Sequence, residues 1–461
     1  MTVAIIRHKL ALSIETFGDR MERQQLKQVI IDQRQQLNLP ESFIARNIRD
    51  ELASLQKTRQ ILVITGIRRS GKSTLLQEIR NNAKEKNYYF NFDDNRLTNF
   101  TLADFEILLE LFVELYGAEK TAYFDEIQNI PEWERFVRRL HDQGYKIYIT
   151  GSNATMFSQE LGTRLTGRYI KIELYPFSFA EYVSWKKPEL LTSKQLTSMQ
   201  KAELQNLFAG FYENGGFPEF LLLKNKAYLQ NLFESILYRD IIVRFGVNER
   251  AVKELCVFLA SNISSNITYN SLRKTLGLAN ATTVSDYCSY LSNSYLCFFV
   301  NRFSYSLKEQ IHYAKKTYFI DHALAKAIGF RSSDDQEKTL ENIVFLELKR
   351  CACEIYFHKQ KYECAFVLKQ GTKIVVALQV SLSLQNAATK KRALQGLIEA
   401  MENYGLTQGF VLTENDKIST EQVHNGNSKY TIHVIPIWRW LLNKKNNLNV
   451  DHLILSFNEI V

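Results

Sequence analysis

The chain has 461 residues, 45% of them hydrophobic and 12% aromatic, which is enough to fill the cores of roughly two to four domains. Its 58 basic against 49 acidic residues give a net charge of +9, which favours anionic partners only weakly, because a mildly basic surface explains it equally well. No run approaches the roughly 18 apolar residues of a membrane span, and the six cysteines fit a reducing compartment. We therefore expect a cytoplasmic protein without a membrane partner.

The N-terminal part, residues 1–49, is predicted to be a polar and mainly helical segment. From Ile61 onward strands and helices alternate, which predicts an α/β core with a parallel sheet over residues 50–175. Strands are expected at Ile61–Thr65, Tyr88–Phe92, Thr121–Phe124, Lys146–Thr150 and Tyr169–Leu174, and helices after Gly71, at Leu102–Leu115 and at Trp133–His141.

A glycine-rich loop follows the first of these strands and leads into a helix. Its sequence, Gly66-Ile-Arg-Arg-Ser-Gly-Lys-Ser, is a P-loop in which backbone N–H groups and the helix N-terminus surround phosphates. Lys72 is expected to reach the β- and γ-phosphates, and Ser73 to give its hydroxyl to Mg²⁺. The residues predicted to bind ATP here are Gly66, Arg69, Ser70, Gly71, Lys72, Ser73 and Thr74.

Two acids end the third predicted strand. The carboxyl ends of parallel strands face the ligand crevice, so Asp125 is expected to hold Mg²⁺ together with Ser73. Glu126 is placed to polarise a water for attack on the γ-phosphorus. Because the second acid is retained, the pair favours hydrolysis over binding alone.

Polar and basic residues follow the next strands. Asn153, with Ser152 second, is the candidate sensor of the γ-phosphate, although a capping turn would also explain it. Arg168, with Arg164 second, is the candidate for stabilising charge on the transferring phosphoryl group. An arginine that acts on a neighbouring subunit requires a homo-oligomer, and the sequence leaves this open.

These motifs together resemble one family. They are joined by Gly167-Arg168, by Leu174-Tyr-Pro-Phe-Ser-Phe-Ala-Glu-Tyr and by Gly215-Gly-Phe-Pro-Glu. The set is similar to bacterial and archaeal AAA-type ATPases that carry a winged helix and a restriction-endonuclease-like domain. The resemblance implies ATP as the nucleotide, a helical lid over residues 176–245, and Gly216 to Pro218 near the nucleotide.

A winged helix is expected over residues 246–328. Three short helical patterns, with Gly277 in the turn between the second and third, are followed by strands at Tyr295–Val300 and Lys316–Ile320. The third helix, Asn280–Ser292, carries no Lys or Arg, so base readout is not favoured. Non-specific DNA contact through Arg273, Lys274, Lys315 and Lys316 remains one interpretation, and a protein client is the other.

The last section, residues 329–461, resembles the nuclease-like domain without its chemistry. Ala365, Gln379 and Ser381 stand where members with an intact signature carry an aspartate, a glutamate and a lysine. Glu341 and Glu363 remain, but two acids alone are a poor metal site. The sequence therefore predicts an ATPase without nuclease activity; the alternative is a slow nucleotide-gated scaffold that binds protein partners.

Overall fold

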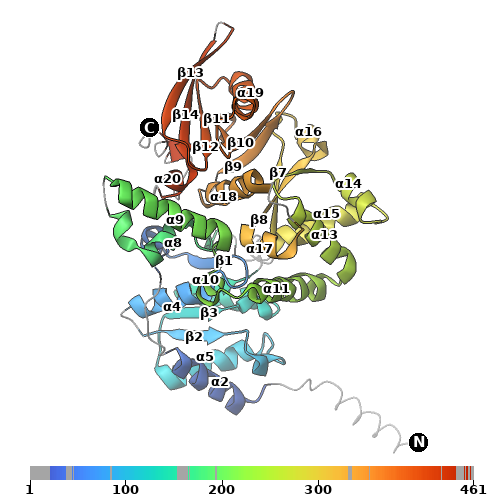
Figure 1. Cartoon of the computed structure of the whole chain (residues 1–461). Coiled ribbons are helices and arrows are strands. Elements are labelled where there is room, and N and C mark those ends of the chain that lie inside the picture. The colour runs from blue at the N-terminus through green and yellow to red at the C-terminus, as the bar shows by residue number, and fades with distance from the viewer. Residues whose placement is uncertain are drawn as a thin grey trace, which may run out of the picture. The chain divides into compact units, whose positions relative to one another are not determined.

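The computed structural model describes residues 21–37, 44, 46–83, 86–152, 165, 167–192, 195–330, 335–351, 353–426, 428–442, 451, 453–454 and 457. The chain divides into two compact units (Figure 1). The first unit comprises residues 1–43, 51–65 and 72–173, and the second comprises residues 44–50, 66–71 and 174–461. Within the described ranges, no helix combines the length and the apolar character that crossing a membrane requires.

A five-stranded parallel sheet forms the centre of the first unit, in the order β2-β3-β4-β1-β5. Its strands are β1 (Ile61–Thr65), β2 (Tyr88–Asn91), β3 (Thr121–Asp125), β4 (Lys146–Gly151) and β5 (Tyr169–Glu173). The helices of this part are α2 (Arg23–Gln36), α3 (Arg49–Leu55), α4 (Lys72–Asn82), α5 (Asp104–Tyr116) and α6 (Trp133–Asp142), with 3-10 turns at Asn95–Leu97 and Ile127–Asn129.

The sequence of these strands explains their position. β1 and β3 are buried at every residue, as expected for parallel strands that are covered on both faces. Aromatic side chains fill the space between sheet and helices, and Phe105 of α5 stacks on Phe136 of α6 with ring centroids 4.3 Å apart. All five strands begin at the predicted residue, and their ends shift by at most one residue from the prediction.

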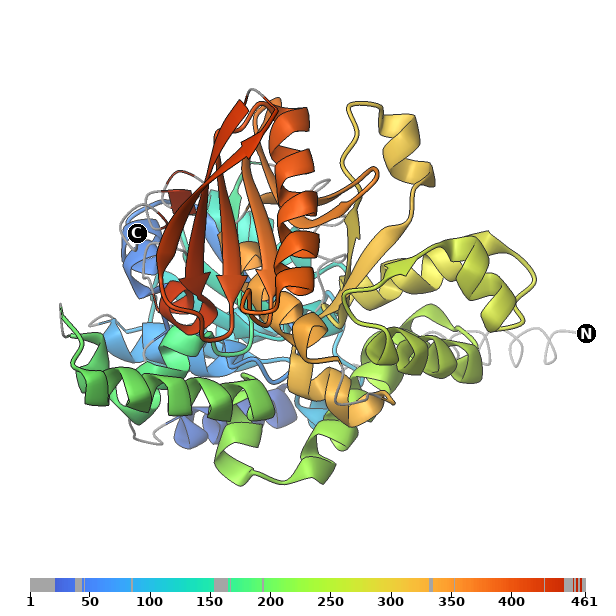
Figure 2. The same cartoon turned by 45° about the horizontal axis from the view of Figure 1, so that its top comes forward.

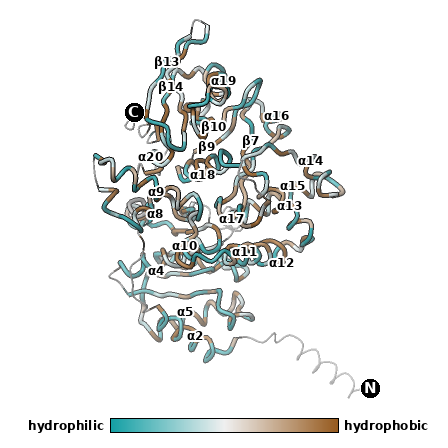
Figure 3. Tube along the Cα trace, viewed as in Figure 1, coloured by the Kyte–Doolittle hydropathy of each residue, from teal (hydrophilic) through white to brown (hydrophobic). Residues whose placement is uncertain are grey.

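The long C-terminal part of the second unit, residues 174–461, starts with a helical segment, where the sequence predicts a lid. Its elements are α8 (Phe179–Lys186), a 3-10 turn (Pro188–Leu191), α9 (Ser198–Asn214), α10 (Pro218–Leu223), α11 (Lys226–Ser235), the π-helix η4 (Ile236–Ile242) and α12 (Val243–Phe245). Hydrophilic and hydrophobic colours alternate along α9 and α11, as expected for helices with one buried face (Figure 3). Ser178 and Glu181 form a capping box that starts α8.

The next elements have the order of a winged helix. They are α13 (Glu249–Ser261), β6 (Asn266–Ile267), α14 (Tyr269–Thr275), α15 (Ala281–Asn293), β7 (Cys297–Asn301), α16 (Leu307–His312), β8 (Lys315–Phe319) and α17 (His322–Ile328). The three strands form an antiparallel sheet in the order β6-β8-β7. The short helix α16 within the wing was not predicted.

A six-stranded mixed sheet completes the second unit, in the order β13-β14-β12-β11-β10-β9. Its elements are α18 (Gln336–Arg350), β9 (Glu354–Lys359), β10 (Glu363–Gln370), β11 (Lys373–Ser381), α19 (Ala387–Tyr404), β12 (Gln408–Thr413), β13 (Ser419–Asn425), β14 (Ser428–Pro436) and α20 (Ile437–Leu441). Helix α19 lies along this sheet against β10, β11 and β12 (Figure 2). This is the second α/β domain that the sequence predicts.

Candidate nucleotide site

Asp125 is the centre of a polar cluster in the first unit. It is the last residue of β3 and only 2% exposed. The Ser73 hydroxyl donates to its Oδ1 over 3.1 Å, and the Thr150 hydroxyl, from the end of β4, donates to the same oxygen. The structure thus brings the serine and the aspartate predicted to share Mg²⁺ into direct contact.

Glu126 follows in a left-handed conformation with φ 51°. Its Oε1 lies 3.6 Å from Lys72 Nζ, and its Oε2 accepts from the Gln128 amide over 2.5 Å. The Glu126 N–H donates to the Thr150 hydroxyl over 3.0 Å. Thr150 therefore holds both acids in place.

The electrostatics of this cluster are unbalanced. Burial, with the Glu126 carboxylate second, raises the pKa of Asp125 from 3.8 to about 6, although hydrogen bonds from Thr150 and Ser73 act in the opposite direction. Such a carboxylate is stabilised when a cation arrives. Its oxygen donors are the type that Mg²⁺ prefers, so the residues present fit that ion.

The glycine-rich loop, residues 66–71, belongs to the second unit. Gly66 has φ 150°, and a Cβ there would lie 2.1 Å from the Leu174 carbonyl oxygen, so a side chain does not fit. The Ser70 hydroxyl is buried and has no hydrogen-bond partner among the residues that the structure describes, which leaves a polar atom in the loop for a ligand.

Arg46 holds the end of this loop. Its guanidinium donates to the Ser70 carbonyl over 2.9 Å, to the Tyr175 carbonyl over 2.6 Å and to Glu181 Oε1 over 2.9 Å. Burial alone would raise the pKa of Glu181, but Arg46 and then Arg350 lower it below its usual value. This buried pair fixes the loop relative to the start of α8.

Two arginines of the loop are ion-paired with lid helices. Arg68 Nη2 lies 3.1 Å from Asp240 Oδ1 in η4, and Arg69 Nη1 lies 3.4 Å from Glu219 Oε2 in α10. Arg69 also has φ 66°, a conformation that non-glycine residues seldom adopt. These two ion pairs connect the loop to the lid helices.

Gly216 and Pro218, predicted near the nucleotide, lie in the same part of the unit. The Gly216 N–H donates to Asp321 Oδ2 over 2.7 Å, and its carbonyl accepts from Phe177 over 2.7 Å. A Cβ at Gly216 would lie 2.3 Å from the Phe177 carbonyl oxygen, which explains this glycine by packing. Its N–H is already engaged, so a nucleotide contact at Gly216 would need a rearrangement; Pro218 is the first residue of α10.

Arg168 is not where the sequence places it. Its carbonyl accepts from the N–H of Ile61, the first residue of β1, whereas Lys72 comes after the other end of that strand. Its Nε lies 3.1 Å from Asp142 Oδ1 at the end of α6. These contacts place Arg168 at the start of β1 and away from Lys72, and its predicted role in its own or a neighbouring subunit stays a prediction.

The remaining candidates from the sequence are Asn153, Arg164 and Ser152. Asn153 and Arg164 lie outside the described residues. Ser152 is buried just after β4, two residues beyond Thr150. The roles proposed for Asn153 and Ser152 as sensors remain untested.

Comparisons with known proteins agree with this geometry. A family model described as "AAA domain" matches residues 58–183, and one described as "Domain of unknown function (DUF8612)" matches residues 205–335. The uncharacterized protein MJ1544 of Methanocaldococcus jannaschii is 32% identical over 402 residues, which cover 83% of this chain and 88% of that protein. The chain belongs to the bacterial and archaeal family of AAA-type P-loop ATPases.

Other matches to this AAA-type ATPase are more distant. An uncharacterized protein of Haemophilus influenzae is 29% identical over 387 residues, covering 79% of this chain and 93% of that protein. Among solved structures, the ORC1 protein of Aeropyrum pernix in complex with DNA matches with a TM-score of 0.31 and 12% identity, over 63% of this chain and 93% of that chain. A likeness this low assigns no function.

Three residues of the ATPase site were missed from the sequence. Thr150 carries a recognisable signal, since it is a polar residue at the end of an apolar strand beside the acids. Gln128 stands two residues after Glu126 and was read only as part of the motif. Arg46 lies in a segment interpreted as solvated helix, and no local pattern distinguishes it from other arginines.

The basic residues predicted to touch DNA differ in exposure. In the last turn of α14, Arg273 is half-buried and Lys274 is exposed. Lys315 is half-buried and donates to Asn301 Oδ1 over 2.5 Å. The Lys316 side chain is only 3% exposed and is ion-paired inside the unit, so its prediction as a phosphate contact is wrong.

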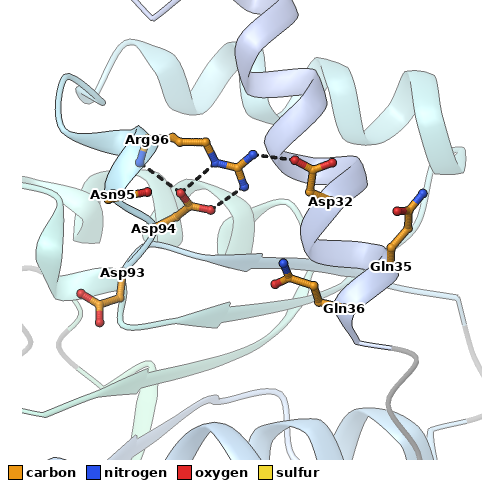
Figure 4. Close-up of a pocket in the computed structure, with 7 residues that line it drawn as sticks. All are labelled: Asp32, Gln35, Gln36, Asp93, Asp94, Asn95 and Arg96. Carbon is orange, nitrogen blue, oxygen red and sulfur yellow. Dashed lines mark hydrogen bonds and ion pairs between the residues drawn. The ribbon is translucent and has the colours of Figure 1, made fainter.

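An open groove of about 770 Å³ lies elsewhere in the first unit (Figure 4). It is lined by Asp32, Gln35, Gln36, Asp93, Asp94, Asn95 and Arg96. The guanidinium of Arg96 lies 2.5 Å from Asp32 Oδ2 and 2.8 Å from Asp94 Oδ2, so these three charged groups are paired with one another. These contacts account for the groove as a polar surface between α2 and the turn after β2.

Proposed function

We propose that this AAA-type ATPase binds Mg-ATP at its P-loop and hydrolyses it. The observation that carries the proposal is the Ser73–Asp125 contact of 3.1 Å with Glu126 and Lys72 beside it. Bound Mg²⁺ would neutralise charge on the β- and γ-phosphates. Ser73 and Asp125 are the residues that would hold it.

The remaining residues have distinct parts in this proposal. Lys72 attracts the phosphates, which compete with Glu126 for its ammonium group. Glu126 then accepts the proton of the attacking water, and Gln128 and Thr150 keep its carboxylate and backbone in position. A positioned base of this kind contributes on the order of 10²–10⁴-fold to the rate.

Coupling to the rest of the chain is proposed through the loop arginines. Phosphates near the loop would attract Arg68 and Arg69 away from Asp240 and Glu219. Asp240 lies in η4, which leads through α12 into α13 of the winged-helix part. Nucleotide state would in this way change how the lid holds the following domains.

The test compares two substitutions in the full chain. Lys72→Ala is expected to abolish ATP binding in a calorimetric titration, because the ammonium group is lost. Glu126→Gln is expected to bind ATP and to hydrolyse it at least about 10²-fold more slowly. Glu110→Gln, in an exposed ion pair on α5, is the matched control and should behave as the parent. Normal hydrolysis by Glu126→Gln contradicts the assignment of the base.

A nucleotide-gated scaffold that binds protein partners is the second candidate. Two observations favour it. Lys316 is buried and so does not contribute to the predicted DNA-contacting surface, and the described helix α15 contains no Lys or Arg. The ATPase rate with and without DNA separates the two. Stimulation by DNA supports a DNA-dependent enzyme, and an unchanged rate supports the scaffold.

A further inference from the structure

A buried lysine joins two acids in the second unit. Lys316 is the second residue of β8, paired with Asn266 of β6 and Val300 of β7. Its Nζ lies 2.9 Å from Glu341 Oε1 on α18 and 2.7 Å from Glu363 Oε1 at the start of β10. One ammonium group thus connects the winged-helix sheet to a helix and a strand of the C-terminal domain.

Both acids have further donors. The Tyr318 hydroxyl donates to Glu341 Oε1 over 2.6 Å. Asn266 Nδ2 and Lys359 Nζ donate to Glu363 Oε2 over 2.9 and 3.1 Å. With Lys359 included, two positive charges meet two negative ones, so the cluster is balanced without an ion from outside.

The protonation of the cluster agrees with this balance. Burial alone would lower the pKa of Lys316, but Glu341 and Glu363 together raise it above its usual value. Burial would also raise the pKa of Glu363, yet Lys316 outweighs it and the pKa falls to about 2. Lys316 and Glu363 therefore each stabilise the charged form of the other.

The neighbouring strand positions carry no charge. Ala365 lies on β10, and its N–H donates to Gln379 Oε1 of β11 over 2.8 Å, so the amide is used within the sheet. Ser381, further along β11, is fully buried. Among the positions compared with an active nuclease domain, only Glu341 and Glu363 are acids, and both contact Lys316. The residues present therefore do not fit the divalent ion of such a domain.

We propose that Glu341 and Glu363 form a cation site in which the Lys316 ammonium group replaces a divalent metal ion. The replacement excludes metal from the C-terminal domain and ties that domain to β8. If the lysine were absent, Mn²⁺ or Mg²⁺ would find two carboxylates there, together with the Tyr318 hydroxyl beside Glu341 and the Asn266 side chain beside Glu363, which is more than the two acids alone. The proposal does not depend on ATP hydrolysis.

The experiment is to remove the lysine and offer the metal. Mn²⁺ binding is measured by electron paramagnetic resonance on the nucleotide-free full chain, for the parent, Lys316→Ala and Lys315→Ala. We expect Lys316→Ala to gain one bound Mn²⁺ that the parent lacks, and to lose it again when Glu341→Gln is added. Lys315→Ala is the matched control on the same strand, because Lys315 contacts Asn301 rather than an acid, and it should bind no more Mn²⁺ than the parent.

Two results would overturn the proposal. The first is a folded Lys316→Ala chain that gains no Mn²⁺, and the second is parent protein whose Mn²⁺ binding disappears with Glu341→Gln. If Lys316→Ala does not fold alone, it is refolded with Mn²⁺. Recovery of folding with the metal supports the site, and failure to recover contradicts it.

Discussion

The ATPase core and the C-terminal domain each place a lysine beside two acids, and they use the arrangement differently. In the core, Lys72 Nζ lies 3.6 Å from Glu126, while the side chain of Asp125 accepts hydrogen bonds from the hydroxyl groups of Ser73 and Thr150. In the C-terminal domain, Lys316 Nζ lies 2.9 and 2.7 Å from both acids. Both lysine side chains are 3% exposed, so burial does not distinguish them.

The difference lies in whether the acids are neutralised from within the chain. Burial raises the pKa of Asp125 to about 6, and the ion pair lowers the pKa of Glu363 to about 2. An acid with a raised pKa gains from a cation that comes from outside, and one with a lowered pKa already has its partner. The same residue types therefore form the proposed binding site in one region and a structural connection in the other.

The largest expected difference is in the rate of ATP turnover, when a glutamate is replaced by glutamine in the ATPase core or in the C-terminal domain. Glu126→Gln should lower kcat by about 10²–10⁴-fold, because a proton acceptor is lost. Glu363→Gln should leave kcat of the folded protein near that of the parent, because Glu363 has no part in the proposed chemistry. A steady-state ATPase assay measures both, and equal losses would end the distinction between the two acid pairs.

The second contrast concerns stability when each lysine is removed. Lys316→Met should lower the free energy of unfolding by about 3 kcal/mol, because it leaves the buried Glu341 and the partly exposed Glu363 without their shared cation. Lys72→Met should cost less, since the Glu126 carboxylate keeps the Gln128 amide. Urea unfolding measures both, with Lys315→Met as control. A larger loss for Lys72→Met would reverse the comparison.

The third contrast is a difference of sign in the dependence on pH. Because the folded pKa of Asp125 is raised, its contribution to stability is present below pH 3.8 and is lost as the pH rises through about 6. Asp125→Asn should therefore stabilise the nucleotide-free protein at pH 8, on the order of 1 kcal/mol or more, and not at pH 4.

Glu363 should behave in the opposite way. Its lowered pKa means that its contribution is present above pH 4.5 and is lost as the pH falls through about 2. Glu363→Gln should lower stability at pH 8, and the loss should shrink toward acid pH. Thermal unfolding at several pH values tests both variants, and two curves of the same sign would contradict the assigned electrostatics.

The smallest expected effect separates exposed from buried basic residues. If the winged-helix part binds DNA, replacing Arg273 and Lys274 by alanine should reduce the slope of log K against log salt by about one to two units. Lys316→Arg should leave the slope unchanged, because that side chain is buried. Fluorescence anisotropy over a salt series measures this, and a flat response in the parent removes DNA as a partner.

Much of the ATPase core could be predicted because its signals are local. The apolar run of β1, the glycine spacing after it and the acids that end β3 each occupy a few consecutive residues. Strand alternation then brings Ser73 and Asp125 to one edge of the sheet, and the structure confirms their contact. The sequence placed Arg168 near the nucleotide edge of the sheet, whereas it directly precedes β5 and contacts the start of β1. Closeness in sequence to the other motifs did not show at which end of the strands it lies.

The C-terminal domain was predicted with less detail, because its strands lack comparable motifs. β10 and β11 are apolar and mostly buried, whereas β9 and β13 are partly exposed and more polar, and their sequences show no clear strand pattern. The wing helix α16 has six residues, too few for a reliable periodic signal.

The sequence by itself determined the P-loop, the paired acids of β3 and the replacement of charged residues by Ala365, Gln379 and Ser381. Only the tertiary structure decided that Lys316 is buried and ion-paired with two acids. Lys315 and Lys316 are adjacent in sequence, yet one contacts an amide and the other contacts two carboxylates. Side chains on consecutive strand residues point to opposite faces, so their partners come from distant parts of the chain that meet only after folding.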